Sequence, residues 1–175
     1  MEKIPDAFII IFLYLITIQD FRQRKISWIL IPLLILFMVM SAAITNSLTQ
    51  VFRFALFNSC FMIFQLVLLT LYFSIKKKKI TNIINSNIGI GDILFFLVLC
   101  LAFSPLNFTI YYLSSLIITL IGFTIYKKKI IGIMKAEIPL AGAFAISLIL
   151  CLGMKYFVPI SLYQDNWFMQ GLNYK

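Results

Sequence analysis

Histidine is absent from this sequence, and acidic residues are scarce, with six Asp and Glu against fifteen Lys and Arg. The three cysteines, Cys60, Cys100 and Cys151, lie in separate apolar stretches and form no Cys-x-x-Cys pair. Zinc and haem sites of the usual kinds need histidine or clustered cysteine, so we expect neither a metal nor another cofactor. No disulfide framework is indicated either, and each cysteine is interpreted as a small buried apolar residue.

Apolar residues dominate what is present. They make up 62% of the 175 residues, and the mean hydropathy is +1.02. Since a soluble domain is roughly 45–50% apolar, the excess predicts burial in lipid and an all-α membrane protein. The net charge of +9 could indicate nucleic-acid binding, but the basic residues form short clusters between apolar runs. That pattern is typical of membrane topology, so we expect no nucleic-acid partner.

Six apolar runs follow one another along the chain. Their approximate bounds are 5–18, 28–44, 51–75, 90–103, 108–126 and 138–153. Neither an internal repeat nor a linker is visible, so we expect one domain over residues 1–175, folded as a single bundle of about six transmembrane helices. The first run has the length of a signal peptide but lacks a small-x-small cleavage site, and we expect it to be retained.

The basic residues predict an orientation. If the first run enters from outside, the segments on the inner side carry eleven Lys and Arg, and the outer segments carry four. Because such residues concentrate in cytoplasmic loops, we expect both termini on the outer side of a cell inner membrane. The basic clusters would then set the topology and bind anionic membrane lipids.

Two aspartates stand out among the six acidic residues. Asp20 closes the first apolar run, and Asp92 opens the fourth, directly after Gly89-Ile90-Gly91. The predicted topology places both at the cytoplasmic face. One carboxylate at the end of a span is most often only an interfacial group, but two at one depth suggest a function. Glu137, at the inner end of the sixth run, is a rival candidate for a polar role.

Two carboxylates that share a site can hydrolyse a peptide bond. Because both cannot ionise cheaply, the ionised one can take a proton from water while the protonated one polarises the scissile carbonyl. The positive end of the fourth helix would favour charge on Asp92. Gly89 and Gly91 would leave the adjacent backbone open to a closely approaching chain. Shared membrane depth allows Asp20 and Asp92 to meet but does not require it.

Three segments resemble motifs of the type IV prepilin peptidases, and they occur in that family's order. Residues 17–28, TIQDFRQRKISW, resemble the segment around the family's first aspartate. Residues 89–92, GIGD, resemble its GxGD motif, and residues 138–145, IPLAGAFA, are similar to its late IPFGPFLA-like segment. The resemblance implies an intramembrane aspartic endopeptidase that removes the short basic leader of prepilin or pseudopilin-like proteins. Asp20 and Asp92 would be the catalytic pair, and Gly89, Gly91 and Pro139 would contact the substrate.

The chain departs from this family in three places. Leu94 stands where the family often has lysine, Ser27 replaces the usual proline, and the cysteine-rich loop of longer members is missing. The missing loop argues against N-methyltransferase activity. Leu94 leaves open a catalytically inactive family member that acts as a membrane assembly subunit. A small proton- or cation-coupled transporter is a further alternative, although such sites usually lie near the bilayer midplane.

Overall fold

The computed structural model describes residues 3–78, 88–129, 138–155, 157 and 162–164. These residues form six α-helices and no β-strand, which confirms the prediction of an all-α chain for this part of the protein. The helices are α1 (Lys3–Gln23), α2 (Leu30–Thr45), α3 (Leu48–Lys77), α4 (Ile90–Cys100), α5 (Pro105–Lys129) and α6 (Leu140–Met154). Each one corresponds to one of the six apolar runs. Glu137 lies outside the described residues.

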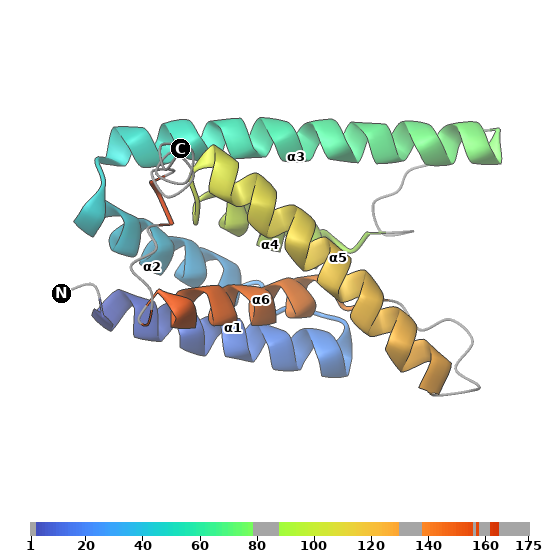
Figure 1. Ribbon diagram of the computed structural model, residues 1–175, viewed down its shortest axis with the longest axis horizontal. Coiled ribbons are helices and arrows are strands. Elements are labelled where there is room, and N and C mark those ends of the chain that lie inside the picture. The colour runs from blue at the N-terminus through green and yellow to red at the C-terminus, as the bar shows by residue number, and fades with distance from the viewer. Residues whose placement is uncertain (1–2, 79–87, 130–137, 156, 158–161, 165–175) are drawn as a thin grey trace, which may run out of the picture.

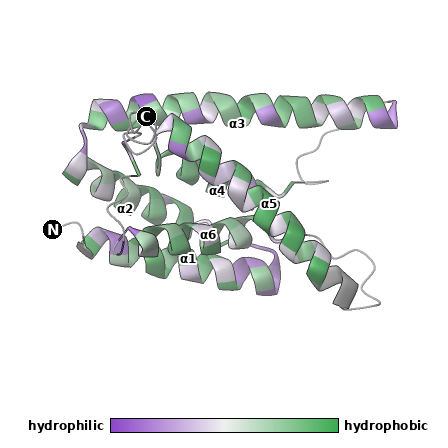
Figure 2. Ribbon diagram, viewed as in Figure 1, coloured by the Kyte–Doolittle hydropathy of each residue, from purple (hydrophilic) through white to green (hydrophobic). Residues whose placement is uncertain are grey.

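Helices α1, α3 and α5 are long and apolar enough to cross a membrane, so the protein is a helical membrane protein. Helices α2, α4 and α6 have 16, 11 and 15 residues. At 1.5 Å per residue, α4 is only about 16 Å long, roughly half of a 30 Å hydrocarbon layer. Of the six spans that the sequence predicts, only three therefore reach spanning length among the described residues. Figure 2 shows that the helices are largely apolar, with hydrophilic residues mainly near their ends.

Helix α1 packs most extensively against α6 and then against α2. These three helices lie on one side of the molecule and α3 lies on the other, with α4 and α5 between them (Figure 1). The C-terminal ends of α1, α3 and α5 point to the same end of the molecule as the N-terminal end of α6. This shared end is where the sequence-predicted site residues lie.

Helix α4 ends inside the bundle, where its last carbonyl groups need hydrogen-bond partners. Asn58 of α3, which is 1% exposed, donates from Nδ2 to the carbonyl oxygens of Cys100 and Phe103, both at 3.0 Å. The hydroxyl of Tyr163 donates to the carbonyl oxygen of Leu101 at 2.7 Å. These contacts allow α4 to stop early and the chain to turn into α5.

An aromatic cluster holds the first half of α6 against α4 and α5. The ring centroid of Phe144 lies 5.2 Å from that of Phe96 and 5.5 Å from that of Tyr112. The hydroxyl of Tyr111 donates to the carbonyl oxygen of Phe144 at 2.6 Å. Because Phe144 lies only five residues after Pro139, this cluster also places the first turn of α6.

Candidate active site

Asp20 lies in the last turn of α1 with its side chain buried, at 6% exposure. Its Oδ2 accepts a hydrogen bond from the backbone N–H of Gly142 at 2.7 Å. The helix ends three residues later, where Arg24 adopts a left-handed backbone (φ 55°) and its amide donates to the carbonyl oxygen of Asp20 at 3.1 Å. No described residue donates to the Oδ1 of Asp20.

Asp92 is the third residue of α4 and accepts two backbone hydrogen bonds. Its Oδ2 accepts from the N–H of Gly89 at 3.3 Å, which caps the start of α4. Its Oδ1 accepts from the N–H of Ala141 at 3.0 Å, which joins α4 to α6. A carboxylate in the first turn of a helix also interacts favourably with the helix dipole.

The first turn of α6 brings the two aspartates together. The N–H groups at a helix N-terminus have no partner within the helix. Here the consecutive amides of Ala141 and Gly142 donate to Asp92 and Asp20 respectively. The Asp20 carboxylate is near enough to act electrostatically on Asp92, and the charge of Arg24 acts on both. The structure thus places at one site the two aspartates that the sequence singles out as a pair.

Gly142 is required for this close approach. A Cβ atom at this position would lie 2.8 Å from Cδ2 of Phe21 and 3.1 Å from Oδ2 of Asp20. The first distance is shorter than real Cβ contacts allow, and the second leaves the carboxylate little room. Glycine at this position therefore lets α6 present its amide to Asp20.

The three residues predicted to contact substrate surround the same turn. Gly89 precedes α4 with an extended backbone, and Pro139 is the buried N-cap of α6. Gly91 faces the link between α1 and α2, because a Cβ there would lie 3.3 Å from Cδ1 of Ile26. All three residues therefore lie beside the aspartates, and their contact with a substrate remains a prediction.

The sequence does not predict two features of the site, the groups that donate hydrogen bonds to the aspartates and the effect of the Arg24 charge. The donors to both aspartates are backbone amides, and every residue except proline carries one, so no residue type marks them. Only the start of α6 after Pro139 could have indicated which amides are free. Arg24 was predicted to set topology and bind anionic lipid, and its charge also acts on the aspartate pair.

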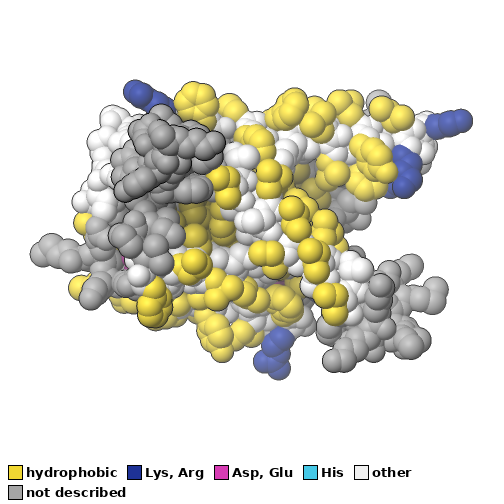
Figure 3. Space-filling model, viewed as in Figure 1, with side chains coloured by type: hydrophobic (Ala, Val, Ile, Leu, Met, Phe, Trp, Pro, Cys, Tyr) yellow, Lys and Arg dark blue, Asp and Glu magenta, His cyan; other side chains and the backbone are white. Residues whose placement is uncertain are grey.

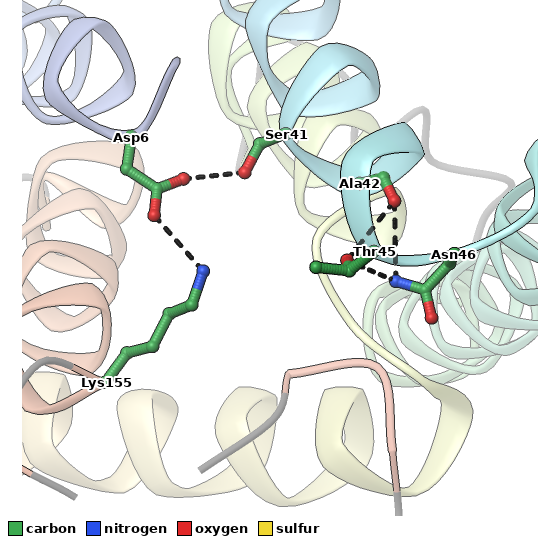
Figure 4. A network of polar contacts seen from close by, with 6 residues as sticks. All are labelled: Asp6, Ser41, Ala42, Thr45, Asn46 and Lys155. Carbon is green, nitrogen blue, oxygen red and sulfur yellow. Dashed lines mark hydrogen bonds and ion pairs between the residues drawn. The ribbon is translucent and has the colours of Figure 1, made fainter. Parts of the chain in front are cut away.

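A buried carboxylate also lies at the opposite end of α1 from Asp20. Asp6 is 1% exposed. It accepts a hydrogen bond from the hydroxyl of Ser41 at 2.6 Å and pairs with the Nζ of Lys155 at 3.2 Å (Figure 4). It is buried because α2 and α6 supply these partners.

Within the described ranges, no three His, Cys, Asp or Glu side chains lie close enough together to hold a metal ion. Asp20 and Asp92 therefore form a two-carboxylate site in this part of the chain. Such a site can share a proton and act on water.

No protein-family model, curated protein or solved structure matches this chain.

Proposed function

We propose that this protein is an intramembrane aspartic endopeptidase that removes the short basic leader of prepilin or pseudopilin-like proteins at the cytoplasmic face. The observation that carries the proposal is the convergence of Asp20 and Asp92 on the adjacent amides of Ala141 and Gly142. The three segments with prepilin-peptidase resemblance contain these residues, and they meet at one place although they are distant in the sequence.

In the proposed reaction the aspartate pair shares one proton. The ionised carboxylate takes a proton from water, and the resulting hydroxide attacks the scissile carbonyl carbon while the protonated carboxyl donates to the carbonyl oxygen. The tetrahedral intermediate then collapses, the C–N bond breaks, and a proton passes to the leaving amine. The amides of Ala141 and Gly142 hold one oxygen of each aspartate.

Helix capping alone would explain the two amide contacts, but it does not explain why two carboxylates share one place. A single carboxylate could accept both N–H groups, and adjacent negative charges repel each other. Two carboxyl groups held close together are typical of a catalytic pair in which one group acts as the general acid and the other as the general base.

The proposal includes a topology. Helices α2, α4 and α6 would complete a bundle of about six transmembrane segments in a cell inner membrane, with both termini outside. Lys76, Lys77 and Lys78, at the C-terminal end of α3, lie at the same end of the molecule as the aspartates. The positive-inside rule then assigns this end to the cytoplasm.

The test is cleavage of a co-expressed prepilin-like protein by Asp20→Asn and Asp92→Asn. Each change should lower the cleavage rate by about 10²–10⁴-fold, because one of the two proton-transfer roles is lost. Asparagine keeps a carbonyl oxygen that can accept the same amide, so both variants should stay folded. Asp6→Asn is the matched control, since it neutralises a buried carboxylate far from the site, and at equal folded protein it should cleave normally. Wild-type rates in either site variant would refute the catalytic pair.

The alternative of an inactive assembly subunit is favoured by Leu94, which lies on α4 two residues after Asp92 where the family often has lysine. Under this alternative the wild-type protein cleaves no prepilin-like substrate. The same assay therefore separates the two proposals.

A further inference from the structure

An apolar groove of about 540 Å³ runs along one face of α3. The α3 residues that line it recur three or four positions apart, and Gln65 and Leu69 are among them. Its other walls come from α4, α5 and α6 and include Phe96 and Leu116. Figure 3 shows apolar side chains over this region and a hollow between the diverging ends of α3 and α5. The groove is thus a lateral opening between α3 and the helices that face it.

Two residues of the groove wall directly precede residues whose amides bind Asp92. These two wall residues are Ile88 and Leu140. Ile88 directly precedes Gly89, and Leu140 directly precedes Ala141, and the amides of Gly89 and Ala141 both donate to Asp92. A chain lying in the groove would therefore pass beside the two segments that hold Asp92.

Among the described residues of the groove wall, Gln65 is the only one with a side-chain amide. It makes no hydrogen bond to any other residue in the described part of the chain. A polar side chain within a membrane-spanning helix usually has a partner or marks a functional surface. Since the neighbouring wall residues are apolar or aromatic, the missing partner would come from the occupant of the groove.

We propose that this groove binds the apolar helix that follows the cleavage site of the substrate, and that Gln65 hydrogen-bonds a polar group on that helix. This inference rests on the proposed peptidase function. The lining residues of α3 run from Met62 to Phe73, about 16 Å along the helix axis, which matches about three turns of a bound helix. A lipid acyl chain could fill the apolar walls but offers no group that hydrogen-bonds the amide.

A photocrosslinking experiment tests the location. The probe is a synthetic peptide with a short lysine-containing leader, a cleavage junction and a Leu/Ala helix of about 20 residues that carries one Asn in its second turn. Benzoylphenylalanine replaces Leu69 in the groove or, as the matched control, Phe64 on the lipid-facing side of α3, where the side chain is 61% exposed. In Asp20→Asn protein in phospholipid vesicles, the peptide should crosslink to position 69 and not to position 64. Equal yields at both positions, or no crosslink at position 69, would overturn the groove assignment.

A second experiment tests Gln65. The Asn-containing peptide should bind about three- to tenfold more tightly than the same peptide with Leu in place of Asn. Gln65→Leu should abolish this difference, and an unchanged preference would remove Gln65 from the proposal. In protein that keeps both aspartates, Leu69→Trp should slow cleavage because the larger side chain fills the groove. Val67→Trp should not slow cleavage, because Val67 does not line the groove.

The two proposals can fail separately. Crosslinking at position 69 with a Gln65-dependent preference, but without cleavage by the wild-type protein, would support the groove and refute the peptidase. Aspartate-dependent cleavage without crosslinking at position 69 would support the peptidase and refute the groove.

Discussion

Gly142 shows how a single residue controls the geometry of the aspartate pair. It is the third residue of α6, its amide donates to Asp20, and it has no side chain to separate α6 from α1. Gly91 is equally small but has a different neighbour, the flexible end of the Ile26 side chain. We therefore expect the same substitution to affect the cleavage rate differently at the two positions.

Gly142→Ala should lower the cleavage rate by about 10–100-fold, because the added methyl group would displace Phe21 and push the Asp20 carboxylate away from its amide. Gly91→Ala should lower the rate less than Gly142→Ala does, since Cδ1 of Ile26 can move by a few tenths of an ångström. Initial cleavage rates at matched amounts of folded protein provide the measurement. A more damaging Gly91→Ala would contradict this assignment.

At the scale of helices, the short elements depend on polar contacts from their neighbours. Helix α4 can stop inside the bundle because Asn58 of α3 and Tyr163 donate hydrogen bonds to the carbonyl oxygens at its C-terminal end and in the turn that follows. An apolar environment offers no water to replace such contacts. Asn58, in the interior of α3, thus supplies the hydrogen bonds that the end of a neighbouring helix needs.

Asn58→Ala should reduce the free energy of unfolding by about 1–3 kcal/mol, because the carbonyl groups of Cys100 and Phe103 would lose a buried donor. Thr124→Ala serves as a control, since Thr124 is exposed and bonds only within its own helix. The measurement is the thermal unfolding midpoint in detergent micelles. Equal midpoints for the two variants would show that the Asn58 contacts are dispensable.

Helices α1 and α6 are joined by polar contacts at both ends. Asp6 pairs with Lys155 at one end, and Asp20 accepts from Gly142 at the other. The contacts are separated by about 21 Å along α1 and about 20 Å along α6, at 1.5 Å per residue. Because these spans match, antiparallel helices can make both contacts in one register.

Removing either partner of the ion pair should have unequal effects. The side chain of Asp6 is 2% exposed and that of Lys155 is 24% exposed. Lys155→Met removes the cation facing a buried carboxylate and should cost about 2–4 kcal/mol, whereas Asp6→Asn leaves an ammonium that reaches water and should cost about 1 kcal/mol. The double variant should lose less than the sum of the two. Additive losses in chemical unfolding would show that the pair is not coupled.

At the scale of the whole molecule, the aspartates and the basic ends of the helices share one end. Gln23 and Lys78 lie there, at or just past the ends of α1 and α3. Gln50, in the first turn of α3, lies at the opposite end. The proposed orientation can therefore be tested independently of catalysis.

With the three native cysteines replaced, a single cysteine at Gln23 or Lys78 should react with an impermeant maleimide only from the cytoplasmic side. A single cysteine at Gln50 should react only from outside, because α3 crosses the membrane between these positions. Reaction of the Gln23 variant from outside would invert the topology and place the aspartates on the wrong face for a leader peptide.

The sequence by itself determined the class of this protein and the extent of its helices. Hydropathy and the spacing of basic clusters are local properties, and they predict six helices close to those observed. The bounds differ most at the ends, since α1 extends to Gln23 and includes Asp20 within its last turn. The same local signals marked Asp20 and Asp92 because carboxylates are rare beside apolar runs.

Only the tertiary structure decided that these carboxylates meet, and what joins them. The contact depends on how α1 and α4 pack around α6, and hydropathy carries no information on which helices become neighbours. The amides of Ala141 and Gly142 have no signature in the sequence because nearly every residue has one. The burial of Asp6 was likewise hidden, since its partners Ser41 and Lys155 are 35 and 149 positions away in the chain. Contacts at such separations arise from packing, and packing is a property of the folded chain.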